Sequence, residues 1–211
     1  VFVSIPLIDT ILIDDSFDRE SVNSPFNAKI YCSSIQENRI ENIFGVPMKY
    51  YQHHFEDVKK YLHHRPPYLL VERVLSVSSQ KAVTEKTVTG EEGYIQGHFP
   101  GAPIFPGAMM HELTTQSAGI LIASQYNPME EFNTEDPFFN EYALGVLVKT
   151  KHARYKGFAR PGDVLTTTVT LNDQVSEVFD FSAVVRVDGK IIMKNGFQLM
   201  NIKSKVLQGT D

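Results

Sequence analysis

Two side chains of this sequence, His98 and Glu112, are of types that exchange protons with a substrate. A neutral imidazole can accept a proton at physiological pH, and a carboxyl group that keeps its proton can donate it to a leaving group. The pair is therefore a candidate base and acid for one reaction. Each residue also has an ordinary interpretation, since many loop histidines are only solvated, and Glu112 could point out through a gap or pair with a lysine from another segment.

The two residues belong to adjoining segments of different character. Residues 93–107, GYIQGHFPGAPIFPG, hold four glycines and three prolines, which predicts an irregular loop without helix or strand. The following run, 108–125, has no proline and predicts a helix of about 27 Å, with Pro106 beside its first turn. The helix start offers unpaired N–H groups and a positive dipole end to an oxygen that gains negative charge. Gly107 is the natural donor there, because it has no side chain to block the approach.

Apolar residues surround most of the circumference of the predicted helix, which indicates that it is buried on nearly all sides. A sheet wrapped around one central helix would bury it best. None of the residues three or four positions from Glu112 is positively charged. Burial without a cationic neighbour disfavours the carboxylate, which favours a carboxyl group that keeps its proton.

The strands of that sheet are predicted from alternating and β-branched runs. They begin after Tyr68 with LLVERVLSV and AVTEKTV, and they continue with VLTTTVTL, EVFDFSAVVRV and KIIMKNGFQLMNI. The pair Asp188-Gly189 predicts a tight hairpin between the last two strands. The expected fold class is therefore α+β, with a long antiparallel sheet around a central buried helix.

The remaining segments are assigned as follows. Residues 50–62 have apolar side chains at spacings of four, three and four, which predicts a short amphipathic helix. Residues 125–141 predict an exposed, acidic connection. Residues 1–49 show no motif and are interpreted as an extension, which leaves 50–211 as one domain.

Composition limits the partners and the location. The formal net charge of -5 argues against nucleic acid as a partner, and no stretch approaches the roughly 20 apolar residues that cross a bilayer. Cys32 is the only cysteine and cannot form an internal disulfide, so we expect a cytoplasmic protein. The paired histidines His53-His54 and His63-His64 lack accompanying cysteines, so no metal and no other cofactor is expected.

Residues 97–121, GHFPGAPIFPGAMMHELTTQSAGIL, resemble the signature of the β-hydroxyacyl-acyl-carrier-protein dehydratases, of the FabZ and FabA type and closer to FabZ. The resemblance extends to HRPPYLLVERV at 64–74, RYKGFARPGD at 154–163 and VRVDGKII at 185–192. It implies a single hot-dog fold, in which a sheet surrounds one helix. It also implies a homodimer, or a larger assembly of dimers, that acts on a 3-hydroxyacyl chain held by acyl carrier protein.

The same resemblance implies roles for individual residues. His98 falls on the catalytic histidine of the family and Glu112 on its catalytic acid, the two coming from different subunits. Gly107 falls on the amide that binds the thioester carbonyl. Phe99, Pro106 and Gln116 are expected to complete the substrate-binding site.

Two threonines of the predicted helix depart from the family pattern, whereas Glu112 matches it. Thr114 and Thr115 stand where small apolar residues are usual, and they either alter the pocket wall or hydrogen-bond the preceding helical turn. Family members that also isomerise the new double bond usually have aspartate as the acid, so Glu112 favours plain dehydration.

The predicted reaction is the dehydration of a (3R)-3-hydroxyacyl thioester to the trans-2-enoyl thioester, in fatty-acid or related lipid or polyketide biosynthesis. A hot-dog acyl thioesterase and a catalytically silent acyl-binding subunit are the alternatives. A basic run in this acidic chain is either a solvated face or a dock for the acidic carrier protein, and it comprises Lys149, Lys151, Arg154, Lys156 and Arg160.

Overall fold

The structure is a computed structural model that describes residues 48–136 and 138–207. The predicted extension over residues 1–49 lies almost wholly outside the described residues. The elements, in chain order, are η1 (Val58–Lys60), β1 (Arg73–Val77), β2 (Lys81–Thr87), α1 (Gly93–Gln96), α2 (Gly107–Gln125), β3 (Tyr142–Tyr155), β4 (Val164–Val175), β5 (Val178–Val187), β6 (Lys190–Lys203) and α3 (Ser204–Leu207).

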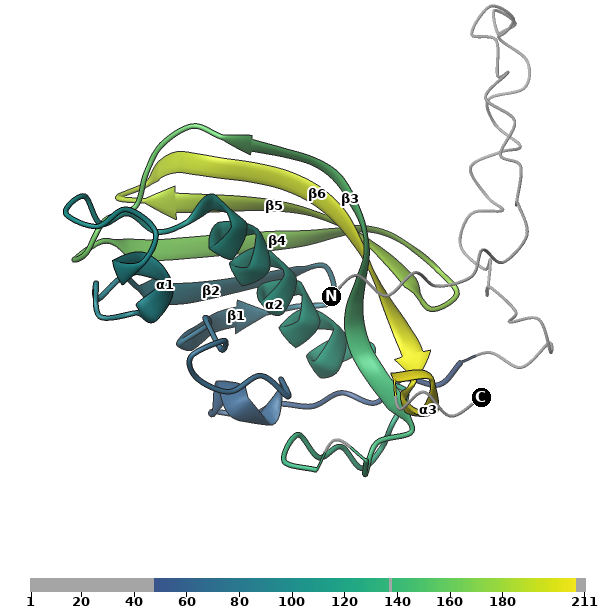
Figure 1. Ribbon diagram of the computed structural model, residues 1–211. Coiled ribbons are helices and arrows are strands. Elements are labelled where there is room, and N and C mark those ends of the chain that lie inside the picture. The colour runs from purple at the N-terminus through teal and green to yellow at the C-terminus, as the bar shows by residue number, and fades with distance from the viewer. Residues whose placement is uncertain (1–47, 137, 208–211) are drawn as a thin grey trace, which may run out of the picture. The chain divides into compact units, whose positions relative to one another are not determined.

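The six strands form one antiparallel sheet in the order β1-β2-β4-β5-β6-β3. Figure 1 shows the sheet curving around α2, with β1 and β3 at its two edges. The predicted α+β class and the sheet wrapped around one helix are confirmed.

The helix α2 is buried, as its sequence predicts. Every residue from Leu113 to Ser124 is buried, and the helix packs against β2, β3, β4, β5 and β6. Ile120 contributes to one hydrophobic cluster with Phe105, while Leu121 contributes to a second cluster with Phe181. Burying each of these large apolar side chains stabilises the fold by about 1.5 to 3 kcal/mol.

Left-handed backbone conformations occur at the β5–β6 hairpin and within β3. The β5–β6 hairpin turns at Asp188 and Gly189, whose φ values of 49° and 75° are both in the left-handed region. A turn with both central residues there matches the twist of the flanking strands, so the hairpin prediction is confirmed. Gly145 of β3 has φ of 68°, and a Cβ atom there would lie 3.3 Å from Cα of Gly119, so β3 passes close against α2.

Two local predictions were wrong. Residues 50–62 form only the short 3-10 helix η1. The chain before it instead bonds to the end of α2 and the segment after it, where the amide of Tyr51 donates to Asn127 O at 2.8 Å and that of His53 to Ser124 O at 2.9 Å. The loop expected to lack helix contains α1, whose first turn begins at the carbonyl oxygen of Glu92, which accepts from the amides of Ile95 and Gln96.

The connection between α2 and β3 is less exposed than predicted. Its described residues include Asn127, Met129, Thr134 and Asn140, all of which are buried. Arg65 donates from Nη2 to Thr134 O at 2.9 Å, which ties the connection to the segment before β1. Tertiary hydrogen bonds of this kind leave no periodic signal in the sequence. The strand β3 also went unpredicted, because all its residues from Leu147 to Tyr155 are exposed and the strand shows no alternation of buried and exposed positions.

Candidate functional site

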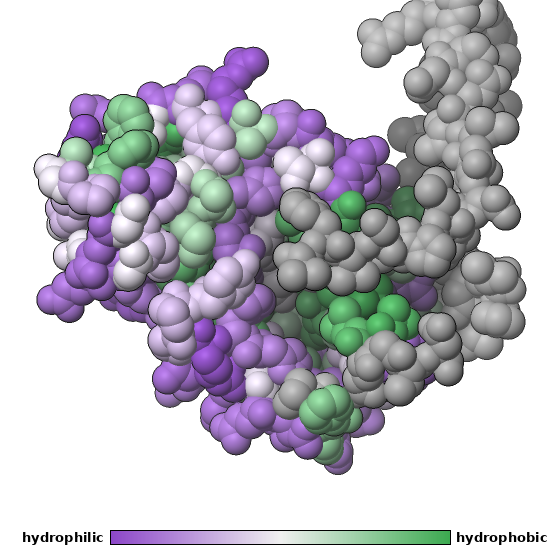
Figure 2. All heavy atoms as spheres, viewed as in Figure 1, coloured by the Kyte–Doolittle hydropathy of each residue, from purple (hydrophilic) through white to green (hydrophobic). Residues whose placement is uncertain are grey.

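A cavity of about 620 Å³ lies beside α2, and Glu112 lines it. The β3 residues 142–147 and Leu62 supply much of the apolar wall, while His64, Tyr68, Thr115 and Gln116 add polar groups. Figure 2 shows hydrophobic residues gathered over β3 near α2, on a face that is otherwise largely hydrophilic. The cavity is therefore suited to an apolar chain with one reactive polar end.

The Glu112 carboxyl group is held by side chains of its own helix. Gln116 Nε2 donates to Glu112 Oε1 at 2.9 Å, and Thr115 Oγ1 donates to Oε2 at 3.2 Å. The Glu112 side chain is 19% exposed. Burial raises the pKa of the nearby Tyr68 hydroxyl, and the Glu112 carboxylate raises that pKa further. The carboxyl group is thus oriented and partly desolvated.

A second segment brings an imidazole to this carboxyl group. His64 Nε2 lies 3.9 Å from Glu112 Oε1, and the His64 ring stacks on Tyr68 at 5.5 Å between centroids. Burial lowers the pKa of His64, Glu112 opposes that effect and Arg65 adds to it. The sequence argument considered only helix neighbours of Glu112 and missed this contact. His64 stands in the HRPPYLL stretch, but only the fold reveals that it faces the acid.

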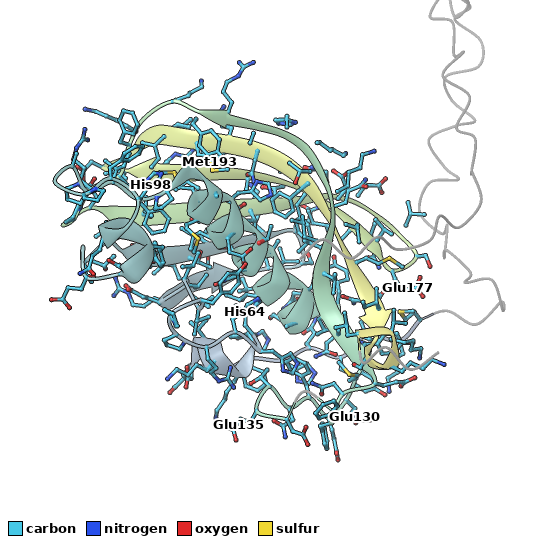
Figure 3. All side chains as sticks on the ribbon, viewed as in Figure 1. His64, His98, Glu130, Glu135, Glu177 and Met193 are labelled. Atoms are coloured by element: carbon cyan, nitrogen blue, oxygen red, sulfur yellow. The ribbon has the colours of Figure 1, made fainter. Side chains whose placement is uncertain are left out.

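His98 does not lie in the cavity that Glu112 lines. It follows α1 in an exposed position, and its ring contacts Phe99 at 4.2 Å between centroids. Figure 3 shows His98 near the start of α2, whereas His64, from the segment before β1, lies beside a later part of that helix. Within one chain, the structure therefore brings Glu112 together with Gln116 but leaves His98 and Phe99 apart from them.

Pro106 and Gly107 lie where α2 begins, as predicted. Pro106 is the N-cap residue, and its carbonyl oxygen accepts from Met110 N at 3.0 Å. A Cβ atom on Gly107 would meet the Tyr155 ring at 3.0 Å. A side chain at position 107 would therefore have to displace the Tyr155 ring of β3, in addition to any effect on substrate binding.

The two threonines of α2 both hydrogen-bond the preceding turn. Thr114 Oγ1 donates to His111 O at 2.6 Å, and Thr115 Oγ1 donates to Glu112 O at 2.8 Å. Thr115 also lines the cavity, so it both forms part of the pocket wall and bonds the preceding turn. Thr114 is buried elsewhere and accepts from Asn195 Nδ2 at 2.8 Å.

The basic run forms an exposed surface at and beyond the end of β3. Lys149, Lys151 and Arg154 belong to β3, Lys156 follows it directly, and Arg160 lies in the turn before β4. Lys151 forms an ion pair with Asp180. The remaining four cations have no ion pair with an acidic side chain among the described residues.

The paired histidines point to different partners. His53 Nε2 contacts Met129 O at 3.0 Å, and His63 Nε2 contacts Asn140 Nδ2 at 3.1 Å. Over residues 48–136 and 138–207, no three His, Cys, Asp or Glu side chains converge as a metal-ligand set.

A protein-family model, described as the FabA-like domain, matches residues 62–195, which include both His98 and Glu112. The chain belongs to the FabA-like domain family. The match also covers β1 to β5 and part of β6, so the FabA-like domain and the wrapped sheet are the same unit.

Named relatives agree with this assignment. The chain is 40% identical over 135 residues to the 3-hydroxyacyl-[acyl-carrier-protein] dehydratase FabZ of Cupriavidus taiwanensis, across 64% of this chain and 84% of that protein. It is 33% identical over 150 residues to the FabZ of Rickettsia massiliae, across 71% of this chain and 95% of that protein. The predicted resemblance to FabZ is confirmed.

A solved structure supports the fold. The dehydratase heterocomplex ApeI:P from Xenorhabdus doucetiae matches with a TM-score of 0.59 at 20% identity, over 74% of this chain and 97% of that chain. The FabA-like domain thus has the predicted hot-dog fold. None of its described helices has the length and apolar character needed to cross a membrane.

Proposed function

We propose that this FabA-like protein is a hydro-lyase that dehydrates a 3-hydroxyacyl chain carried on acyl carrier protein, as a step of fatty acid biosynthesis. His98 removes a proton from C2 of the acyl chain. Glu112 donates its proton to the C3 hydroxyl group as the C3–O bond breaks. Water and a trans-2-enoyl thioester are the products, and the two residues end the step with the opposite protonation states.

The observation that carries the proposal is the placement of Glu112 in the apolar cavity. Donors at 2.9 Å and 3.2 Å meet its two oxygens, so the carboxyl group is oriented while its far side faces the cavity. An acid needs this arrangement to reach a leaving hydroxyl group on an apolar chain. Proton transfer requires the donor to lie within hydrogen-bond reach of the leaving oxygen, whatever the pKa of the donor.

The base is supplied by a second copy of the chain. His98 and Glu112 do not share a cavity within one chain, so a complete acid and base pair needs a partner. The edge strand β3 is a suitable interface, because Leu147, Val148 and Tyr155 are all more than 40% exposed on it. Unpaired edge strands with exposed apolar side chains favour pairing with another chain. A homodimer that joins two β3 strands would cover this surface.

The substrate thioester enters beside the start of α2. In this arrangement the Gly107 amide donates to the thioester carbonyl, while Phe99 and Pro106 flank the acyl chain near His98. The basic surface of Lys149, Lys151, Arg154, Lys156 and Arg160 attracts the acidic carrier protein by local charge complementarity. A cytoplasmic location fits the single cysteine, Cys32, and the use of a carrier protein.

The proposal is tested by hydration of crotonyl thioester, the reverse reaction, followed by loss of enoyl absorbance. The purified chain should catalyse hydration without releasing free thiol. Thiol release from the acyl thioester, with no change attributable to hydration, would instead identify a thioesterase. Tight binding of the thioester without either reaction would identify a silent acyl-binding protein.

A further inference from the structure

The imidazole of His64 is held against the acid of the site by its own surroundings. Its ring stacks on Tyr68 with an interplanar angle of 28°, and its Nε2 atom lies 3.9 Å from Glu112 Oε1. The His64 side chain is 37% exposed. The ring therefore borders both the cavity and solvent.

The two ring nitrogens of His64 have different environments. Nδ1 is buried and has no hydrogen-bond partner, whereas Nε2 faces the Glu112 carboxyl group. A buried N–H group without an acceptor is costly, so the proton of the neutral ring belongs on Nε2. The imidazolium form would place a second proton on the unpartnered Nδ1, so it is disfavoured. Burial lowers the pKa of His64, which agrees with a neutral ring.

We propose that His64 is a positioning residue for the dehydration, which donates a hydrogen bond from neutral Nε2–H to the carboxylate that Glu112 becomes. The inference rests on the proposed function. As the C3–O bond breaks, water leaves with the Glu112 proton, and the negative charge remains on the carboxylate. His64 gains and loses no proton. The His64 ring then joins the other donors around this charge, which are the Thr115 hydroxyl, the Gln116 amide and the Tyr68 hydroxyl.

The separation of 3.9 Å suits the state before proton transfer. It is longer than a hydrogen bond, and a shift of about 1 Å brings Nε2 within donor range. A further donor already in place beside Gln116 and Thr115 would favour the carboxylate before the reaction and leave less of Glu112 with a proton to donate. One that approaches as charge forms stabilises the transition state selectively.

Few other charged groups face His64. Arg65 is its neighbour in sequence, and its Nη1 and Nη2 atoms donate to the carbonyl oxygens of Leu62 and Thr134 at 2.9 Å. Tyr68 and His63 come from the same segment, and Tyr142 lines the same cavity from β3. Glu112 is the only carboxylate among the described residues of the cavity wall. A change in the pH profile on replacing His64 would therefore act through its contact with Glu112.

The test compares variants that keep or remove the donor. His64→Gln keeps an amide N–H near the position of Nε2, while His64→Phe and His64→Leu remove the donor. His54→Gln is the matched control, because His54 is an exposed histidine outside the cavity. The measurements are kcat and KM for dehydration across pH, with thermal unfolding of each protein.

We expect His64→Phe and His64→Leu to lower kcat by about tenfold to a hundredfold. This factor corresponds to the usual free-energy contribution of a hydrogen bond to a charged group. KM should change less than kcat, since His64 lines the cavity but donates its hydrogen bond only to the carboxylate that forms during the reaction. The basic limb of the pH profile should move to higher pH, because the carboxylate has lost a donor. His64→Gln should retain most of the activity and the wild-type limb.

Two outcomes would overturn the role of His64. One is a folded donor-free variant with wild-type kcat and basic limb. The other is an equal loss in His64→Gln and His64→Leu with unmoved limbs, which would assign a packing role. Absence of dehydration in both the wild type and His54→Gln would instead overturn the proposed function itself.

Discussion

Gln116 connects Glu112 to the chain segment before β1. Its Nε2 atom donates both to Glu112 Oε1 at 2.9 Å and to Tyr68 O at 2.8 Å, while its Oε1 atom accepts from Leu70 N at 2.8 Å. The Gln116 side chain was expected to bind substrate. It lines the cavity, and its amide also orients the acid and anchors residues 68–70.

Replacing this amide should affect activity and stability together. Gln116→Leu leaves the Leu70 N–H group and the Tyr68 carbonyl oxygen without their partner, which should lower the free energy of unfolding by about 1 to 3 kcal/mol. It should also lower kcat, because Glu112 loses its orienting donor. Urea unfolding and turnover measure the two effects. Gln80→Leu, at an exposed position, should change neither, and equal behaviour of the two variants would refute the anchoring role.

The close approach of Tyr155 to Gly107 makes a steric prediction. Gly107→Val should lower kcat/KM strongly, because the new side chain obstructs the thioester at the helix start. Displacing the Tyr155 ring should also destabilise the protein by about 1 to 3 kcal/mol. Thermal unfolding must accompany the kinetics. Gly93→Ala is the control, because a Cβ atom on Gly93 meets nothing within 4 Å.

A second substitution separates the two consequences at Gly107. In Gly107→Val combined with Tyr155→Ala, the ring no longer needs to move, so stability should recover while activity stays low. Recovery of activity along with stability would mean that Gly107 serves packing only.

An ion-pair network before His98 predicts acid sensitivity. Burial raises the pKa of Glu92, but hydrogen bonds from the Lys86 ammonium and the Thr89 amide outweigh it and lower the pKa from 4.5 to about 2. A carboxyl group with a lowered folded-state pKa adds stability above its unfolded pKa and loses it as pH falls through its folded pKa. Stability from Glu92 should therefore be present above pH 4.5 and should disappear between pH 4.5 and about pH 2.

This dependence can be assigned to Glu92 by substitution. Above pH 4.5, Glu92→Gln should be less stable than wild type by on the order of 2 kcal/mol, since the Lys86 pair is lost. The difference should shrink as the pH falls towards 2. Urea unfolding at a series of pH values measures it, and a constant difference at all pH values would contradict the assignment.

The proposed carrier surface predicts that charge-reversed variants bind the carrier-bound acyl chain more weakly but bind a small thioester as before. Lys156→Glu with Arg160→Glu should raise KM for the carrier-bound acyl chain about tenfold or more at low salt, and less at high salt. KM for a small thioester should not change. Lys81→Glu, on an exposed residue at the opposite end of the sheet, is the charge-matched control. An equal effect on both substrates would point to the active site instead of the carrier.

Much of this fold follows from local patterns. The helix α2 has apolar residues around its circumference and a proline before its start, and Asp188-Gly189 fixes a turn by conformational preference alone, so both were predictable. The strand β3 was not, because its residues from Leu147 to Tyr155 are all exposed and show no alternation of buried and exposed positions. Residues 50–62 have a helical spacing of apolar residues, but hydrogen bonds to the end of α2 and the segment after it prevail over it.

In the candidate site, too, some features follow from local sequence and others only from the fold. The place of Glu112 on the helix and of His98 in the loop before it followed from the sequence, and their catalytic roles stay predictions. The contact of His64 with Glu112 joins residues 48 positions apart, and no local pattern encodes such a contact. The role of Gln116 as an anchor likewise depends on the path of residues 68–70 past the helix.

The central claim is that His98 of one chain acts with Glu112 of another. Mixing inactive His98→Ala and Glu112→Gln proteins under subunit exchange tests it most directly, because each mixed dimer then holds one site with both residues intact. With equal amounts and complete exchange, about one quarter of wild-type dehydration activity should return. If exchange is demonstrated by mass spectrometry and the mixture stays as inactive as its components, the shared site is wrong.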